Sequence, residues 1–413
     1  MKILSVILYN LFIQLYAFSI RIASIWNKKA RMWVRGRKTF PDFQFDKKTI
    51  WMHCASLGEF EQGRPVLENL KKSYPEHSIV LSFFSPSGYL SAQKHKDNYQ
   101  IIYLPLDTAF NAKKIISRIN PGIVLWVKYE YWYHHLTEIK KGNIPLLLIS
   151  GIFRENQPFF KFYGHLWRKI LRSFTHFFVQ NSHSKLLLES IGFNENITIS
   201  GDTRFDRVIE IAENKVPVEG IDAFKENNRL LVAGSTWKED VQMLAEYAKK
   251  NPSLKFVIAP HEISMHSLKE TKNIFSNAVL YSELKINSAL SETSNVLIID
   301  NIGMLSRLYA YADICYIGGG FNKSGIHNTL EAAAYGKPVV FGPHYKKFEE
   351  ANRLIKEGGG ATFRNYSELE KILNEFIGNP EKLMEAGKKA KEIVYNSKGA
   401  TEKISAYIKG IFS

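Results

Sequence analysis

The chain has 413 residues, of which 45% are hydrophobic and 23% are charged. It is too long for a single hydrophobic core and too apolar for a disordered protein, so we expect two packed domains. Its 55 Lys and Arg against 40 Asp and Glu give a formal net charge of +15. This excess favours anionic partners such as phospholipid headgroups, phosphorylated substrates or nucleic acid.

The two cysteines lie in apolar runs, Cys54 after Trp51 and Cys315 before Tyr316. We expect both to be buried free thiols, as in a protein of a reducing compartment. No cluster of cysteine and histidine residues predicts a metal site.

The N-terminus begins with an apolar segment. Residues 3–20 carry no formal charge and are just numerous enough to cross a bilayer. Seven cations follow this segment: Arg21, Lys28, Lys29, Arg31, Arg35, Arg37 and Lys38. By the positive-inside rule they place the body of the protein in the cytoplasm. We therefore predict a membrane anchor over residues 1–24, with an interfacial helix, a buried helix or a cleaved signal peptide as alternatives.

A second membrane candidate is the stretch 159–172, where aromatic and cationic residues mix in what reads as a helix. Such a helix can insert aromatic rings among lipid headgroups while its cations contact phosphates. The alternative is a helix that packs on the core and exposes a basic face to solvent.

Short β-rich runs alternate with helical stretches along two parts of the chain. The strands expected in the first part are 49–54, 78–83, 100–103, 122–127, 146–149 and 177–179. Those expected in the second part are 229–233, 255–259, 295–299, 314–317 and 338–341. This alternation predicts an α/β fold with two Rossmann-like lobes, each built on a parallel sheet, plus the N-terminal anchor helix.

The domain boundaries follow from the same pattern. We assign 25–208 to the first lobe, 209–227 to a polar connection, 228–395 to the second lobe and 396–413 to a C-terminal helix. In two-lobed transferases such a final helix commonly returns to the first lobe. Because ligands of open parallel sheets bind beyond the carboxyl ends of the strands, we expect the chemistry in a cleft between the lobes.

A glycine-rich segment follows the strand that ends at Ile317. Gly318, Gly319 and Gly320 let the backbone approach a ligand closely, and free amides at a helix start near Asn328 suit a phosphate. Glu331, expected one turn into that helix, is suited to accept hydrogen bonds from ribose hydroxyls. A tight turn without a ligand is the alternative for the glycines alone.

Several motifs in order give the chain a resemblance to a known family. They are Ser56-Leu57-Gly58-Glu59, Glu130-Tyr131-Trp132, Gly201-Asp202-Thr203-Arg204, Ala233-Gly234-Ser235-Thr236 and His327-Asn328-Thr329-Leu330-Glu331. Together they resemble the Kdo transferases of lipopolysaccharide synthesis, which have the GT-B fold. The resemblance implies inverting transfer of Kdo from CMP-Kdo to a lipid A precursor, with neither metal nor cofactor.

The resemblance also implies roles for three residues of the first lobe. Glu59 is the expected general base, because the family's Ser-x-Gly-Glu motif places its base there, and Glu61 is its competitor. A carboxylate at that place can accept the proton of the attacking hydroxyl. Glu130 and Arg204 match positions that stabilise the transition state, with structural salt bridges as the alternative for both.

In the second lobe the resemblance implies a CMP site. Its residues are Gly234, Ser235, Thr236, Pro260, His261, Ile302, Gly303, Met304, Gly318, Gly319, Gly320, Asn328, Thr329, Leu330 and Glu331. The chain departs from the family pattern at Asp202 and Arg204, where the family usually has Asn and Lys. At Pro260-His261-Glu262 it lacks the usual Arg, which puts one phosphate contact in doubt.

The expected partners are CMP-Kdo, an anionic lipid A precursor and the phospholipid surface of the inner membrane. Nucleic acid is not expected, because no recognised binding module appears. The alternative functions are a GT-B transferase with a UDP-sugar donor or a nucleotide-sugar epimerase. A transferase with a UDP-sugar donor does not predict the Ser-x-Gly-Glu motif with the later motifs of the first lobe, and an epimerase needs no anchor.

Overall fold

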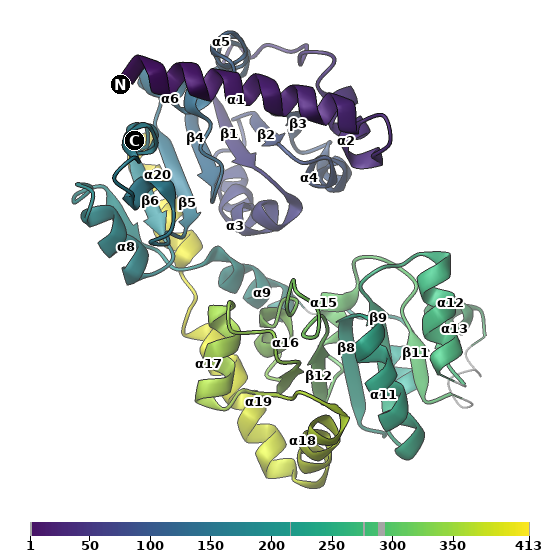
Figure 1. Ribbon diagram of the computed structural model, residues 1–413. Helices are drawn as coiled ribbons and strands as arrows, with labels where there is room; N and C mark the ends of the chain where they lie inside the picture. Colours follow the sequence, from purple (N-terminus) through teal and green to yellow (C-terminus); the bar gives the residue numbers. More distant parts are fainter. Residues whose placement is uncertain (1, 215, 276, 288–293, 413) are drawn as a thin grey trace. The chain divides into compact units, whose positions relative to one another are not determined.

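A computed structural model describes residues 2–214, 216–275, 277–287 and 294–412 (Figure 1). Met1 of the predicted anchor, Lys215 of the predicted connection and residues 276, 288–293 and 413 lie outside the described residues. The chain divides into two compact units. Unit 1 comprises Met1–Arg207 with Gly399–Ser413, and unit 2 comprises Val208–Lys398.

Unit 1 is built on a seven-stranded sheet in the order β3-β2-β1-β4-β5-β6-β7, with every neighbouring pair parallel. Its strands are β1 (Thr49–Cys54), β2 (Ile79–Phe83), β3 (Gln100–Tyr103), β4 (Pro121–Val127), β5 (Leu146–Gly151), β6 (His176–Val179) and β7 (Ile197–Ile199). The six predicted strands are confirmed within two residues at each end. The sequence prediction missed β7, an edge strand of three residues.

The helices of unit 1 cover both faces of this sheet. They are α1 (Lys2–Ala23), α2 (Lys28–Gly36), α3 (Leu57–Ser73), α4 (Pro86–Ala92), α5 (Ala109–Ile119), α6 (Tyr133–Lys141), α7 (His165–Leu171), α8 (Ser182–Glu189), α9 (Thr203–Glu213, which continues into unit 2) and α20 (Ala400–Phe412). Figure 1 shows α1, α5 and α6 on one side of the sheet and α3 and α20 on the other. Strand β1 is buried throughout because its side chains alternate between the two cores, with Trp51 facing one and Met52 the other.

Helix α1 packs against unit 1 along one side only. Tyr9, Ile13 and Ala17 are buried, and the Tyr9 hydroxyl donates a 2.6 Å hydrogen bond to Asp107. The opposite side exposes large apolar side chains: Leu4, Ile7, Leu8, Leu11, Phe12, Leu15, Phe18 and Ile22. By length and composition, residues 4–23 form a helix that could cross a membrane. Because one side of α1 contacts the domain, its packing suits the interfacial alternative.

The predicted helix over residues 159–172 is wrong in its extent. A short 3₁₀ turn, η2 (Pro158–Phe160), and α7 (His165–Leu171) are separated by a turn. Phe159 is buried, whereas Phe162 and Tyr163 in the turn are exposed. Phe159 therefore packs in the core, whereas Phe162 and Tyr163 of the turn are exposed to solvent or to a partner.

Unit 2 repeats the architecture, with a parallel sheet in the order β10-β11-β9-β8-β12-β13-β14. Its strands are β8 (Leu230–Thr236), β9 (Lys255–Pro260), β10 (Val279–Leu280), β11 (Val296–Ile298), β12 (Ile314–Ile317), β13 (Val339–Phe341) and β14 (Gly360–Thr362). The five predicted strands are confirmed, although β8 extends three residues further than predicted. The missed strands, β10 and β14, are again the edges. The predicted fold class is confirmed.

The helices of unit 2 alternate with these strands. They are α10 (Ile221–Lys225), α11 (Lys238–Lys250), α12 (Met265–Ile274), α13 (Tyr281–Ile286), α15 (Leu305–Leu308), α16 (Leu330–Ala334), α17 (Glu349–Glu357), α18 (Tyr366–Gly378) and α19 (Pro380–Tyr395). Helices α11, α12 and α18 bury Leu244, Leu268 and Leu373 in one core with Phe256 of β9. Residues 209–227, predicted as the connection, hold the end of α9 and all of α10 and fall in unit 2.

Helix α20 belongs to unit 1 although it lies at the end of the chain. Ile404 and Ile408 are fully buried in the core that α3 covers. Asp206 accepts hydrogen bonds of 2.6 Å from the amides of Gly399 and Thr401. A carboxylate that binds free amides at a helix start stabilises that helix.

The cysteines are buried and unpaired as disulfides, as predicted. Burial raises the pKa of both the Cys54 and the Cys315 thiol, so both stay protonated at neutral pH.

Candidate active site

The candidate catalytic residues of unit 1 lie at the point where the sheet order reverses. Strands β2 and β3 lie on one side of β1, and β4 lies on the other. Ligands of open α/β sheets bind at such a switch point, beyond the carboxyl ends of the strands. The segment after β1 carries Glu59, and the segment after β4 carries Glu130.

Glu59 is held in place at the start of α3. Ser56 caps this helix, and its hydroxyl accepts a 3.5 Å hydrogen bond from the Glu59 amide. The Glu59 carboxylate accepts a hydrogen bond from the Ala55 amide. The side chain of Glu59 is therefore bound to the backbone of the turn that precedes its own helix. The residue is only 8% exposed.

Burial, and to a smaller extent the nearby charge of Glu130, raise the pKa of Glu59 to about 7. The Ala55 amide, Lys128 and Ser56 partly offset this effect by stabilising the carboxylate. A general base works best when its pKa lies near the operating pH, so this environment suits proton transfer at neutral pH.

Glu61 lies in a different environment. Its side chain is 39% exposed and lies 3.8 Å from Arg64 and 3.9 Å from Arg207, within ion-pair distance of both. This contact network belongs to the outer side of α3. The geometry therefore favours Glu59 over Glu61 as a base.

Glu130 is fixed by two donors. Its carboxylate lies 2.7 Å from Nε2 of the fully buried His53 and accepts a 3.0 Å hydrogen bond from the Trp132 indole. The other ring nitrogen of His53 contacts the Ser82 hydroxyl at 2.8 Å. His53 reaches Glu130 because β1 and β4 are neighbours, with His53 opposite Trp126. The sequence prediction did not identify His53 as a residue that positions Glu130.

Arg204 pairs with Asp202. Its Nε and one terminal nitrogen each lie 2.8 Å from the same Asp202 oxygen, and its amide donates to the other oxygen at 2.9 Å. The two departures from the family pattern in this segment are therefore in contact with each other. Thr203 joins the segment to α3, because its hydroxyl donates to the Gln62 carbonyl. These contacts hold Arg204 in unit 1 beside the start of α3.

Unit 2 has its own switch point, where β9 and β12 flank β8. Gly234, Ser235 and Thr236 end β8, and Gly318 follows β12 in register with them. A Cβ atom on Gly318 would lie 2.3 Å from the Ser235 carbonyl, and Gly319 has a φ of 89° that favours glycine. Gly320 continues this turn. The predicted glycine-rich loop thus packs directly on the end of β8.

Two strand ends at these switch points carry non-glycine residues with left-handed backbones. Lys128 after β4 has a φ of 57°, and Ser235 in β8 has a φ of 55°. Residues held in this conformation cost free energy and cluster at functional sites. Their positions agree with the candidate sites in both units.

The predicted helix start near Asn328 is wrong by two residues. Helix α16 begins at Leu330, so Glu331 lies in its first turn rather than one turn inside. The Leu330 amide, expected to be free, donates a 3.1 Å hydrogen bond to Asn328. Glu331 accepts a 3.1 Å hydrogen bond from the same Asn328 side chain, which orients its carboxylate.

The other predicted CMP residues end neighbouring strands. Pro260 ends β9, and Ile302, Gly303 and Met304 lie between β11 and α15. Ile302 is 90% exposed, whereas Met304 is buried. In the part of the chain that the structure describes, the buried hydroxyls of Thr236 and Thr329 have no hydrogen-bond partner.

An aromatic stack at the carboxyl ends of β8, β9 and β12 was not predicted. Trp237 stacks on His261 at 4.6 Å between ring centroids, and His261 lies 4.5 Å from His327. The Trp237 indole donates a 3.1 Å hydrogen bond to Nε2 of His327. Burial and nearby His261 lower the pKa of His327 to about 4, so this ring is neutral at pH 7. His261 itself is exposed and contributes an oriented ring where the usual Arg is absent.

The comparisons with known proteins agree with the motifs. A family model described as 3-deoxy-D-manno-octulosonic-acid transferase (kdotransferase) matches residues 28–207. The chain is 27% identical over 372 residues to the 3-deoxy-D-manno-octulosonic acid transferase of Aquifex aeolicus, covering 88% of this chain and 95% of the relative. It is 25% identical over 372 residues to a bifunctional glycosyltransferase/methyltransferase of Fusobacterium nucleatum. That match covers 88% of this chain and 55% of the relative, so the chain spans about half of the Fusobacterium protein.

Solved structures share the fold at low identity. The UDP-GlcNAc 2-epimerase of Neisseria meningitidis has a TM-score of 0.62 at 16% identity, covering 88% of this chain and all of that one. MurG of Acinetobacter baumannii has a TM-score of 0.52 at 14% identity, with coverage of 88% and 100%. These likenesses show the fold alone, and an epimerase shares it with a transferase.

The two Rossmann-like units give the chain a fold of the GT-B class, and its sequence relatives are named transferases. The resemblance predicted from the sequence is confirmed. The chain is similar to the 3-deoxy-D-manno-octulosonic acid (Kdo) transferases over 88% of its length, and residues 28–207 match their family model.

Proposed function

We propose that the protein is an inverting glycosyltransferase that moves Kdo from CMP-Kdo to a hydroxyl of a lipid A precursor. The observation that carries this proposal is the buried Glu59 beside Glu130 at the switch point of unit 1. Both lie in the segment that the Kdo transferase family model matches. The hydrogen bonds and ion pairs of the candidate residues then suggest the role of each one in the reaction.

Glu59 is the general base. Its carboxylate accepts the proton as the acceptor oxygen bonds to the anomeric carbon of Kdo, and CMP departs from the opposite face with the electrons of the broken bond. Because the pKa of Glu59 is about 7, a large fraction is ionised at neutral pH. The Ala55 amide and the Ser56 cap keep the carboxylate oriented while it takes up the proton.

Glu130 and Arg204 act on the charge of the transition state. His53 and Trp132 hold Glu130, so its negative charge is fixed near a carbon that becomes electron-poor as CMP leaves. Arg204 supplies a cation for the anionic donor. Its pairing with Asp202 fixes the guanidinium in one orientation and lowers the net positive charge that it offers.

The end of β8, the glycine-rich loop and Glu331 bind CMP. The Gly318 and Gly319 amides donate to the Gly234 carbonyl and the Asp240 carboxylate, so this loop is held in place and its missing side chains let CMP approach closely. The Glu331 carboxylate accepts hydrogen bonds from the ribose hydroxyls. No metal enters this scheme. The hydroxyls of Thr236 and Thr329 are additional polar groups beside this site.

The acceptor is a membrane lipid, so the enzyme works on the cytoplasmic side of the inner membrane. The exposed apolar side of α1 and the exposed rings of Phe162 and Tyr163 support contact with a bilayer. Cations follow α1 in sequence, as expected for a segment that contacts anionic headgroups.

A direct transfer assay tests the proposal. Purified protein is incubated with a lipid A precursor and a system that generates CMP-Kdo, and the lipid product is weighed by mass spectrometry. We expect a mass increase of one or more Kdo units, formed about 100-fold or more slowly by the Glu59→Gln variant. Absence of product from folded, CMP-binding wild-type protein would refute the proposal.

The second candidate is a transferase with a UDP-sugar donor, because a solved structure in complex with UDP shares the fold. Titration calorimetry with CMP and with UDP separates the two candidates. Tighter binding of UDP than of CMP would favour the second candidate over the first.

A further inference from the structure

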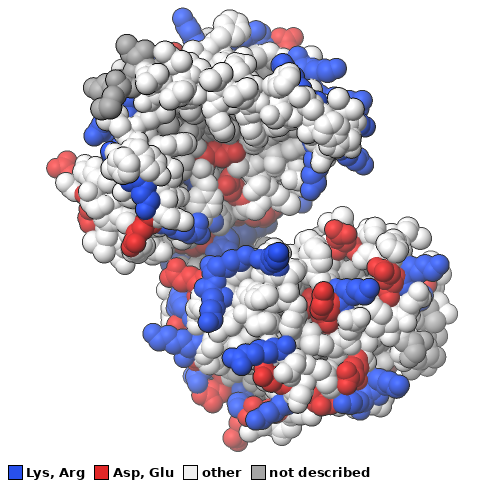
Figure 2. Space-filling model, in the orientation of Figure 1, with Lys and Arg blue, Asp and Glu red and all other residues white. Residues whose placement is uncertain are grey.

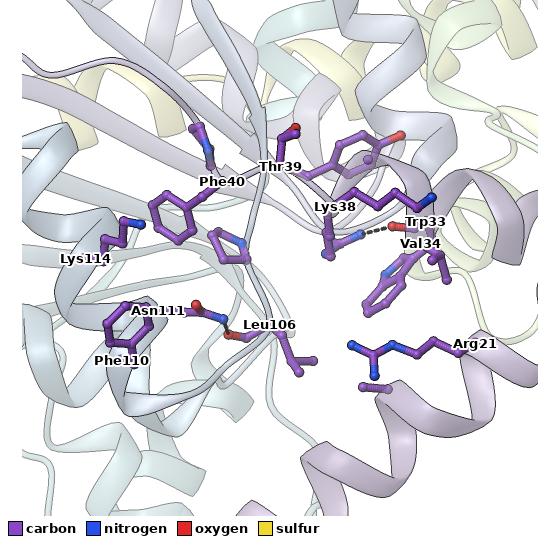
Figure 3. A pocket seen from close by; sticks show the side chains of 16 residues that line it. Arg21, Trp33, Val34, Lys38, Thr39, Phe40, Leu106, Phe110, Asn111 and Lys114 are labelled. Atoms are coloured by element: carbon purple, nitrogen blue, oxygen red, sulfur yellow. Dashed lines mark hydrogen bonds between the residues drawn. The ribbon is translucent and has the colours of Figure 1, made fainter.

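Unit 1 contains a cavity of about 600 Å³ (Figure 3). Neither Glu59 nor Glu130 of the candidate active site lines it. Its walls come from α1, α2, the segment that follows α2, the end of β3 and α5. Figure 3 places Phe40, Phe110 and Lys114 on one side of the cavity, with Trp33 and Arg21 across from them.

The cavity is strongly cationic. Arg21, Arg37, Lys38 and Lys114 line it, and its lining contains no acidic residue. Among the residues that the structure describes, none of these four cations has an acidic group within 4.0 Å. Four cations without acidic neighbours create a positive potential that attracts an anion.

The Arg37 guanidinium is bound to the wall of the cavity. It donates to the carbonyls of Leu104 at 2.9 Å and Phe84 at 2.8 Å, and lies 4.1 Å from the centre of the Trp33 ring. Burial lowers the pKa of Arg37 to about 10, which still leaves it charged at neutral pH. Its contacts are neutral groups and aromatic faces, so its charge is not cancelled within the wall.

The rest of the wall is apolar and continues toward a surface that suits lipid. Trp33, Phe40, Leu106 and Phe110 line the cavity beside the cations. Ala17 and Arg21 of α1 also line it, and the outer side of α1 is apolar and exposed. In Figure 2 the face that carries α1 is largely white, with Lys and Arg gathered where α2 lies. Phosphate-binding cations next to apolar walls match a phosphorylated amphiphile.

The cavity also lies close to Glu130. The Arg37 guanidinium is 4.9 Å from the centre of the Phe84 ring, and Phe84 is 4.9 Å from Trp132. The Trp132 indole in turn donates to Glu130. Two aromatic rings in contact, Phe84 and Trp132, therefore link the cationic cavity to a carboxylate of the candidate active site.

We propose that this cavity binds the phosphate group of a membrane lipid, with Arg37, Lys38 and Lys114 as phosphate ligands and the aromatic wall against the lipid's apolar part. The phosphate comes from one of two sources. It belongs to an anionic phospholipid of the bilayer or to the lipid acceptor of the proposed reaction. The second source rests on the proposed function, and the first does not.

The test uses the full-length protein and two matched double variants. Lys38→Gln with Lys114→Gln removes two cations from the cavity. Lys72→Gln with Lys113→Gln removes two exposed cations from α3 and α5 that neither line it nor belong to the basic segment after α1. Both variants change the charge equally, and the thermal unfolding midpoint of each is checked against wild type.

In the first arm, binding is measured to phosphatidylcholine vesicles with and without phosphatidylglycerol. In the second arm, binding and KM are measured for a lipid A precursor before and after phosphatase treatment. We expect the cavity variant to lose about tenfold or more in affinity for the phosphate-bearing lipid in at least one arm. The control variant should lose clearly less, and affinity for the lipid without the anionic phosphate should stay unchanged.

The arms identify the source and can overturn the proposal. A loss confined to phosphatidylglycerol vesicles assigns the cavity to the bilayer, and a loss confined to the phosphorylated acceptor assigns it to the substrate. Equal losses in both variants, equal losses with and without the anionic phosphate, or no loss in either arm would overturn it. Because lipid binding needs no turnover, a wild-type protein that makes no Kdo product would count against the proposed function alone.

Discussion

Replacing Glu59 by glutamine tests the assignment of the general base. Glutamine keeps the shape of the side chain and an oxygen that can accept the Ala55 amide, but it cannot take up a proton. Turnover should fall by about 100-fold or more, the usual scale for the loss of a general base. Affinity for CMP should stay close to that of wild type, because the residues proposed to bind CMP lie in unit 2.

The raised pKa of Glu59 gives this prediction a second, independent readout. In wild type, kcat/KM should rise with pH through about 7, because only the ionised carboxylate accepts a proton. The stability of the fold should change in the opposite direction. The folded protein holds the proton more tightly than the unfolded chain. This contribution to stability is therefore complete below the ordinary glutamate pKa of 4.5 and is lost as pH rises through about 7.

A pKa that rises from 4.5 to about 7 corresponds to about 3 kcal/mol of unfolding free energy. Above pH 7 the Glu59→Gln variant should therefore unfold at higher denaturant concentration than wild type, although it is nearly inactive. Product formation by mass, CMP titration calorimetry and urea unfolding across the pH range measure the three effects. The control is Glu61→Gln, which removes a half-exposed carboxylate of the same helix.

Two results would refute this reasoning. An active Glu59→Gln enzyme beside an inactive Glu61→Gln enzyme would move the base to Glu61. A rising limb of kcat/KM that persists unchanged in a partly active Glu59→Gln variant would mean that another group titrates.

Three further predictions concern other parts of the chain. Glu331→Ala should weaken CMP binding in calorimetry by about 1.5 to 3 kcal/mol, because the ribose loses a charged acceptor, and unchanged affinity would remove Glu331 from the site. Changing the exposed Leu8, Leu11 and Leu15 of α1 to serine should weaken vesicle binding by about tenfold or more without altering CMP affinity. Equal sedimentation with vesicles would contradict the proposed contact of α1 with the bilayer. Asp206→Ala should lower the free energy of unfolding by about 1 to 2 kcal/mol, since two amides at the start of α20 lose their acceptor, and an unchanged urea midpoint would contradict that role.

The sequence alone predicted the features that depend on neighbours along the chain. The alternation of apolar runs and helical stretches predicted eleven of the strands in their observed order. The missed strands, β7, β10 and β14, are edge strands of two or three residues, too short for a periodic pattern to appear.

Only the tertiary structure shows the order of the strands in each sheet, and this order decides which candidate residues lie close together. Glu59 and Glu130 are neighbours because β4 pairs with β1, and His53 reaches Glu130 across the same pair of strands. The pairing of Asp202 with Arg204 likewise depends on side-chain orientation, which two adjacent motif positions do not reveal.

The same limit applies to residues far apart in the chain. The stack of Trp237, His261 and His327 combines the ends of three strands, and Asp206 caps a helix that begins almost two hundred residues later. Local sequence patterns report helix and strand periodicity and turn chemistry, because these depend on residues a few positions apart. Contacts between distant segments depend on sheet order and on burial of both faces, so only the folded structure could reveal them.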